Sequence, residues 1–139
     1  MKPYVFNVAE TAQACIQWIK DWMQQNGNAN TKVIIGISGG KDSTVVAALC
    51  AQALGKERIL GVMMPNKVQP DIADSEQIIH HLGIPSIKVN INDAYQGITG
   101  AISQALPNHE LNGQYLTNTP ARLRMTTLYG VCALVGNAR

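Results

Sequence analysis

The residues best suited to chemistry lie in one short stretch, SGGKDS, which runs from Ser38 to Ser43. Its two adjacent glycines allow backbone conformations that other residues avoid, and they let a ligand approach the main chain. Its serine hydroxyls and amide N–H groups can donate hydrogen bonds to phosphate oxygens, with the dipole of a following helix behind them. Asp42 is a hard oxygen ligand suited to Mg²⁺ bound to a polyphosphate. The stretch therefore predicts a phosphate-binding turn.

A second interpretation of the same stretch stays open, namely an ordinary strand-to-helix turn in which Asp42 or Ser43 caps the helix. A cap alone does not require two glycines and two serines together, so the combination favours phosphate binding. The stretch differs from the Walker motif, because the earlier glycine of that motif is absent, and from the dinucleotide motif G-x-G-x-x-G. Lys41 either reaches a phosphate or faces solvent.

The turn follows an apolar stretch that is typical of a buried strand. Residues 33–37 (VIIGI) show no alternation of polar and apolar positions, as expected of a strand covered on both faces, and residues 44–54 then suit a helix. A similar apolar stretch predicts a strand at 59–64, and a weaker pattern predicts a third strand at 84–89. Between and after them, helices are predicted to begin at Asp71 and at Asn92 or Asp93.

Helix signals also stand near the two ends of the chain. Asn7, followed three residues later by Glu10, is a capping-box pattern, and the helix that it begins is predicted to end at Gly27 in the left-handed conformation. Residues 107–117 are polar and are predicted to form a loop. Thr119 is then predicted to cap a last helix, with Pro120 in its first turn.

Strands that alternate with helices predict β-α-β units and an α/β fold of three layers, in which helices cover both faces of a parallel sheet. In such sheets ligands bind beyond the carboxyl ends of the strands, where residues 38–43 fall. The 139 residues suffice for one compact domain, so a single domain over 1–139 is predicted.

The composition argues against several classes of function. The sequence has 11 Lys and Arg residues and 9 Asp and Glu residues, so its net charge is small, and no run of basic residues occurs. We therefore predict no nucleic-acid binding. No stretch is apolar for long enough to cross a bilayer or to act as a secretory signal, so no membrane association is predicted. The three cysteines are widely spaced in apolar stretches, which predicts buried free thiols and a cytoplasmic protein. No histidine has a second ligand four residues away, so none is predicted to bind metal.

The order S-G-G-x-D-S at the end of an apolar strand resembles the motif of PP-loop ATP pyrophosphatases, whose fold is of the adenine nucleotide alpha hydrolase type. Two further stretches, Met63–Asp71 and Asn118–Met125, follow it in this sequence. With Leu128 and Tyr129 they closely resemble the ammonia-dependent NAD⁺ synthetases. The string N-x-x-A-R-x-R-M is the most specific part of this resemblance.

The resemblance implies a ligase of NAD⁺ biosynthesis that acts in two steps. ATP adenylates the nicotinate carboxylate of deamido-NAD⁺ and releases pyrophosphate, after which ammonia displaces AMP and NAD⁺ is formed. No side chain need act as a nucleophile, because the substrate carboxylate attacks ATP itself, and catalysis would rest on alignment and charge neutralisation. The resemblance also implies a homodimer, with the last helix near its twofold axis.

The resemblance assigns site residues one by one. Asn118 and Arg122 would hold deamido-NAD⁺, and Asp42 would bind Mg²⁺. The residues that would contact ATP are Gly36, Ile37, Ser38, Gly39, Gly40, Lys41, Asp42 and Ser43, with Met64 and Gln69 beside the base and ribose. Arg124 lies two residues after Arg122 and so points to another face of the helix. It is predicted to form a structural ion pair.

The sequence also departs from the family. The family's chain continues into a further strand and a second acidic Mg²⁺ ligand, of which nothing is present here. Leu134–Gly136 resembles the start of that strand, whereas residues 137–139 do not fit the pattern. The chain is therefore predicted to be an incomplete PP-loop domain whose open sheet edge favours a homodimer, a higher oligomer or a partner. Two alternatives remain: a catalytically silent nucleotide-binding or assembly module of the same lineage, and another PP-loop AMP-forming ligase, such as a tRNA-modifying enzyme.

Overall fold

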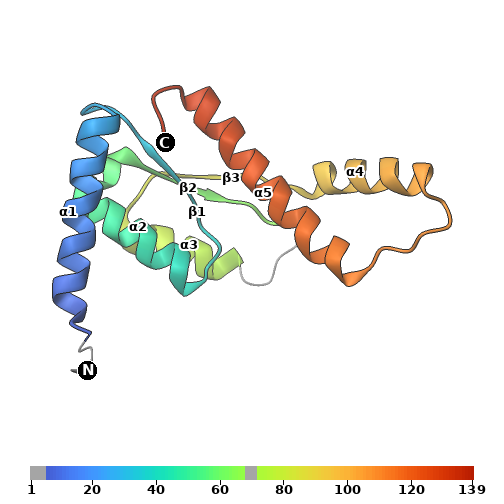
Figure 1. The fold of residues 1–139 in the computed structure, drawn as a ribbon, viewed down its shortest axis with the longest axis horizontal. Coiled ribbons are helices and arrows are strands. Elements are labelled where there is room, and N and C mark those ends of the chain that lie inside the picture. The colour runs from blue at the N-terminus through green and yellow to red at the C-terminus, as the bar shows by residue number, and fades with distance from the viewer. Residues whose placement is uncertain (1–5, 68–71) are drawn as a thin grey trace, which may run out of the picture.

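The computed structural model describes residues 6–67 and 72–139. Three parallel strands form the sheet in the order β1-β2-β3 (Figure 1). They are β1 (Val33–Gly36), β2 (Ile59–Met63) and β3 (Ser86–Lys88). Val33 pairs with Ile59, and Gly61 pairs with Ser86, so all three carboxyl ends meet at one edge. The predicted parallel sheet and its three strands are confirmed.

Helices cover both faces of this sheet, as predicted. They are α1 (Val8–Asn26), α2 (Lys41–Leu54), α3 (Ile72–Leu82), α4 (Asn92–Ala105) and α5 (Gly113–Val135), with a short 3-10 turn, η1 (Lys56–Arg58). Figure 1 shows α2 and α3 on one side of the sheet and α5 across the other, while α4 and the start of α5 extend away from it. None of the helices in the described ranges is long and apolar enough to cross a membrane.

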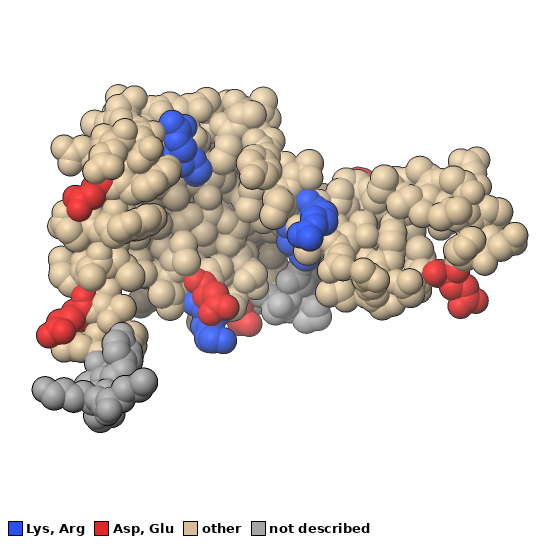
Figure 2. Space-filling model, in the orientation of Figure 1, with Lys and Arg blue, Asp and Glu red and all other residues tan. Residues whose placement is uncertain are grey.

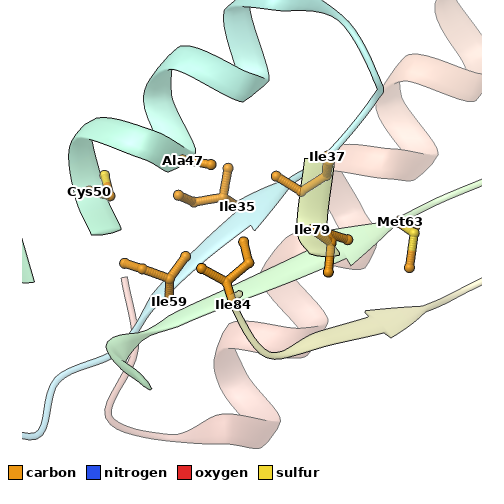
Figure 3. Close-up of a cluster of buried hydrophobic side chains, with 8 residues drawn as sticks. All are labelled: Ile35, Ile37, Ala47, Cys50, Ile59, Met63, Ile79 and Ile84. Atoms are coloured by element: carbon orange, nitrogen blue, oxygen red, sulfur yellow. The ribbon is translucent and has the colours of Figure 1, made fainter. Parts of the chain in front are cut away.

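Two apolar clusters hold the three layers together. On the side of α2 and α3, eight buried residues form one cluster, among them the fully buried Ile59 (Figure 3). On the other side, Val62 and Ile91 pack against Leu123 and Leu128, with Leu123 and Leu128 contributed by α5. Because both faces of β1 and β2 are apolar, these two strands lack alternation, and their side chains contribute to both cores. The short strand β3 is exposed along its length.

Helix α5 begins earlier than the sequence predicted. The amide N–H of Tyr115 donates to Oδ1 of Asn112 at 3.0 Å, so Asn112 caps the helix. The predicted cap at Thr119 is wrong, and Pro120 lies inside the helix, where it is buried. A proline there removes the hydrogen bond to the carbonyl four residues earlier, and its ring crowds that carbonyl. Tertiary packing and the earlier cap outweigh that loss.

Helix α1 confirms one predicted end and contradicts the other. The side chain of Asn7 accepts a hydrogen bond from the amide of Glu10 at 3.2 Å, as the capping pattern predicted. Gly27, however, has a φ of −151° and is extended, so the predicted left-handed end is wrong. A Cβ atom at Gly27 would lie 2.8 Å from Oγ1 of Thr31. Glycine is required there by this close approach.

The last residues of the chain form a third parallel pairing, in which Ala138 pairs with Lys32. Leu134 and Val135 are helical, so the predicted strand start at Leu134–Gly136 is wrong. Gly136 has a φ of +84° and turns the chain back toward the sheet. The amides of Lys32 and Ile34 then donate to the carbonyls of Asn137 and Arg139 at 2.9 and 2.8 Å. The residues that did not fit the family pattern are thus those that pair with β1.

Candidate functional site

The predicted phosphate-binding turn joins the carboxyl end of β1 to the first turn of α2. Gly39 has a φ of +83°, a left-handed conformation that side chains with a Cβ atom rarely adopt. Gly40 is the N-cap of α2 and has no side chain to offer to the free amides of the first turn. These N–H groups are therefore available to an anion. The turn has the predicted backbone, at the predicted edge of the sheet.

The hydroxyls of Ser38 and Ser43 face each other across this turn, with 3.1 Å between their Oγ atoms. The amide N–H of Gly40 donates to Ser38 Oγ at 3.3 Å, and Ser43 Oγ donates to the Gly40 carbonyl at 3.1 Å. These bonds are local, exposed and long for hydroxyl groups. A phosphate oxygen can replace them at little loss, so the hydroxyls are poised to bind one.

Lys41 and Asp42 project from the first turn of α2 into solvent. Each side chain is 91% exposed, and Nζ of Lys41 lies 4.0 Å from Oδ1 of Asp42. Within residues 6–67 and 72–139, no group of three or more His, Cys, Asp or Glu residues could hold a metal ion. Asp42 alone cannot build a metal site. One carboxylate does fit Mg²⁺ that arrives already coordinated by phosphate oxygens and water.

A cavity of about 300 Å³ opens beside the turn. It lies between the carboxyl ends of β1 and β2, the helix α3 and the middle of α5. Its lining residues are Gly36, Ile37, Ser38, Met64, Pro65, Ile72, Ser75 and Arg124. The fold therefore brings Met64 to the turn residues, as the resemblance implied for the ATP site. Gln69, the other residue assigned to the base and ribose, lies outside the described residues.

Two residues of the lining that carry polar groups on their side chains, Ser75 and Arg124, were not identified from the sequence as part of a site. Ser75 is 1% exposed, and its hydroxyl donates to the carbonyl of Ile37 at 3.3 Å, which ties α3 to the segment that leads into the turn. The sequence does contain a signal for Ser75, because it is a polar residue between Ile72 and Ile79 on the otherwise apolar face of α3. Arg124 donates from Nε to the carbonyl of Met64 at 3.0 Å. This hydrogen bond to the main chain replaces the ion pair predicted for it.

Asn118 and Arg122, assigned to the second substrate, lie elsewhere. Both are exposed on α5, four residues apart and so on one face of the helix, and neither lines the cavity. Their assignment to a substrate stays a prediction. On the face shown in Figure 2, basic and acidic side chains are few and dispersed.

Comparisons with known proteins agree on one family. A family model described as NAD synthase matches residues 11–136. The chain is 37% identical over 124 residues to the NH(3)-dependent NAD(+) synthetase of Carboxydothermus hydrogenoformans, a match that covers 88% of this chain and 49% of that protein. The chain spans about half the length of the curated relatives it matches.

Solved structures with the same fold extend the comparison. A glutamine-dependent NAD⁺ synthetase from Acinetobacter baumannii, in complex with ADP, superposes with a TM-score of 0.85 and 27% identity over 99% of this chain and 26% of that one. An NMN synthetase from Francisella tularensis superposes with a TM-score of 0.78 and 27% identity, over 94% of this chain and 52% of that one. The predicted α/β fold of the PP-loop, adenine nucleotide alpha hydrolase type is confirmed.

Proposed function

The chain belongs to the NAD synthase family, and we propose that it binds ATP as one domain of a ligase that amidates deamido-NAD⁺ with ammonia. In that reaction ATP adenylates the nicotinate carboxylate, and ammonia then displaces AMP to give NAD⁺, AMP and pyrophosphate. The observation that carries the proposal is the glycine–serine turn at the carboxyl end of β1, open to the cavity that Met64 helps to line.

The proposed work of the turn is to hold the diphosphate that leaves when the adenylate forms. Its free amides at the start of α2 would donate to phosphate oxygens, and the hydroxyls of Ser38 and Ser43 would exchange their mutual contact for the ligand. The amides are in place before the reaction and need no rearrangement, which is the condition for electrostatic stabilisation of developing charge. We assign no nucleophile to the chain itself.

Mg²⁺ fits this proposal as a companion of the nucleotide. Asp42 would be its protein ligand, since its carboxylate is exposed in the first turn of α2 beside the proposed phosphates. When bound, the ion would neutralise charge on the phosphates. Asp42 would keep that complex at the turn.

The second substrate and the oligomer are proposed from α5. Asn118 and Arg122 share an exposed face, and an amide with a guanidinium four residues later suits a dinucleotide that carries phosphates. Tyr129 and Leu134 on α5 are 72% and 91% exposed, which supports a twofold partner on this helix. We place the protein in the cytoplasm, where the thiols of its three free cysteines would stay reduced.

The test is a turnover assay on the purified chain with ATP, Mg²⁺, deamido-NAD⁺ and an ammonium salt. AMP, pyrophosphate and NAD⁺ should appear in equal amounts, measured by chromatography. Asp42→Asn should lower the rate at limiting Mg²⁺, and Glu57→Gln, an exposed acid on η1, is the matched control for the loss of one negative charge. A parallel arm offers the mononucleotide substrate, because an NMN synthetase shares the fold.

Two outcomes would contradict parts of this proposal. ATP binding without turnover would favour the alternative of a catalytically silent nucleotide-binding module, and a chain that binds no ATP would contradict the proposal entirely. The family match makes another PP-loop ligase, such as a tRNA-modifying enzyme, the weaker alternative.

A further inference from the structure

Arg124 is the charged residue that the fold brings into the cavity beside the turn. It stands in the middle of α5, yet its Nε donates to the carbonyl of Met64, sixty residues away in sequence, at 3.0 Å. Met64 follows the last residue of β2, so this hydrogen bond joins α5 to the carboxyl edge of the sheet. Arg124 is half-buried there. Its position therefore depends on the packing of two layers.

Among the residues that the structure describes, the cavity around Arg124 is otherwise neutral. Of the eight described residues that line it, Arg124 alone carries a charge, and the others are apolar, glycine, proline or serine. Lys41 and Asp42 are close in sequence to the turn, but they point into solvent and do not line this space. A single cation in a neutral concave surface favours an anionic ligand. The volume of about 300 Å³ is at the lower end for a small-molecule site, roughly 300–1,000 Å³.

The geometry leaves part of the guanidinium free to bind such a ligand. Its Nε is used by the Met64 carbonyl, which holds the plane of the group, while its two terminal nitrogens have no hydrogen-bond partner within the part of the chain that the structure describes. A guanidinium keeps its positive charge in proteins, and its planar edge matches two phosphate oxygens at once. If Arg124 served only to hold Met64, this charged edge would have no function in the cavity.

We propose that Arg124 is a nucleotide-binding residue whose terminal nitrogens contact phosphate oxygens of ATP where the cavity meets Ser38. The inference rests on the proposed ATP binding and deepens it, because it adds a cation that the sequence had assigned to a structural role. The different positions of Arg122 and Arg124 on α5 follow from helix geometry. Residues two apart point about 200° from each other around a helix, so Arg124 faces the nucleotide cavity and Arg122 the opposite side.

The first experiment compares ligands that differ only in phosphates. Arg124→Met removes the charge and keeps a long side chain, and titration calorimetry with ATP and with adenosine then separates charge from cavity shape. The affinity for ATP should fall roughly ten- to hundredfold, as expected for a lost hydrogen bond between charged groups. The affinity for adenosine should change less than about threefold, and Arg124→Lys should restore part of the ATP affinity. Lys20→Met on α1, an exposed residue, is the matched control for losing one positive charge.

The second experiment needs no variant and so does not depend on the folding of one. Phenylglyoxal, which modifies guanidinium groups, is applied to the wild-type chain with ATP, with adenosine or with neither, and the modified residues are mapped by mass spectrometry. ATP should protect Arg124, and adenosine should not. Arg139, exposed at the opposite edge of the sheet, should react alike in all three samples.

The outcomes separate this inference from the proposed function. If the wild type binds ATP but Arg124 is not protected, or if Arg124→Met binds ATP as the wild type does, the inference is overturned and the proposed function stands. Equal losses of ATP and adenosine affinity in Arg124→Met would also overturn it, because they would indicate a structural role through Met64. A wild-type chain that binds no ATP would overturn both.

Discussion

The polar groups at the two edges of the sheet differ in how they are hydrogen-bonded. At the carboxyl edge, Ser38, Gly40 and Ser43 make exposed contacts of 3.1–3.3 Å within a few residues of sequence. At the amino edge, Thr31 is fully buried, and its hydroxyl donates to Oδ1 of Asn137 at 2.8 Å, across 106 residues of sequence. The first arrangement leaves donors that a ligand can use, whereas the second uses its donors to join distant segments.

The amino-edge network consists of Asn28, Thr31, Arg58 and Asn137. The amide of Asn28 donates to Thr31 Oγ1 at 2.8 Å, and Nδ2 of Asn137 donates to Asn28 Oδ1 at 3.0 Å. Arg58 donates to the carbonyls of Thr31 and Asn28 at 3.0 and 3.1 Å. The network holds the residues after α5 beside β1. We therefore expect stability to depend mainly on the amino edge, and the proposed ligand binding to depend on the carboxyl edge.

The largest effect on stability is expected for Thr31→Val, which keeps the shape of the side chain and removes its hydroxyl. The Asn28 amide loses its acceptor and the Asn137 side chain loses a donor, so the free energy of unfolding should fall by about 1–3 kcal/mol. Chemical denaturation measures it, with Thr126→Val as control, since the Thr126 hydroxyl only donates to the Arg122 carbonyl within α5. The affinity for ATP should not change. A loss of ATP affinity in the folded variant would contradict the separation of stability and ligand binding between the two edges.

Asn137→Ala should have a smaller effect on the same network. Its side chain accepts from Thr31 and donates to Asn28, but Asn137 is exposed and water can replace part of both contacts. We expect a loss of about 0.5–1.5 kcal/mol in the free energy of unfolding. Asn30→Ala, in the same loop, is the control, because Asn30 joins the network only through its main chain. Equal stability of the two variants would show that the network does not hold the residues after α5.

Ser43→Ala tests the carboxyl edge, where we expect a loss of ATP affinity with little change in stability. Its contacts are local and exposed, so the free energy of unfolding should change by less than about 0.5 kcal/mol. The affinity for ATP should nevertheless fall about tenfold, because a hydrogen bond to a charged phosphate is lost. Denaturation and calorimetry on one sample measure both quantities. A large loss of stability without a loss of ATP affinity would mean that the turn is structural.

The smallest effect is expected on the alkylation rate of Cys50, a reporter that the wild-type chain already carries. Cys50 lies near the end of α2, in the same buried cluster as Ile59, and burial raises the pKa of its thiol. Because the thiolate is the reactive form, Cys50 should be alkylated more slowly than Cys15 at neutral pH, and its rate should keep rising with pH above the ordinary thiol range. Mass spectrometry after timed alkylation measures this. ATP should leave the rate unchanged, and Thr31→Val should raise it.

Elements specified by neighbouring residues could be predicted from the sequence. The apolar stretches of β1 and β2 and the glycines and serines of the turn each act within a few residues, so the sheet and the turn were predicted with their places in the fold. Asn112 is a cap of the same local kind. It was missed because Pro120 offered a second, stronger signal for a helix start, and a buried proline is tolerated only when tertiary packing compensates for the lost hydrogen bond.

Sequence alone determined that this chain has a parallel sheet with a turn of glycines and serines at its carboxyl edge, because hydrophobic pattern and glycine conformation are local properties. The tertiary structure decided which arginine of α5 enters the cavity, because that depends on the rotation of the helix about its axis as Leu123 and Leu128 pack on the sheet. It likewise decided that Asn137–Arg139 pair with β1. That pairing depends on a strand edge a hundred residues earlier, with no trace in the residues themselves.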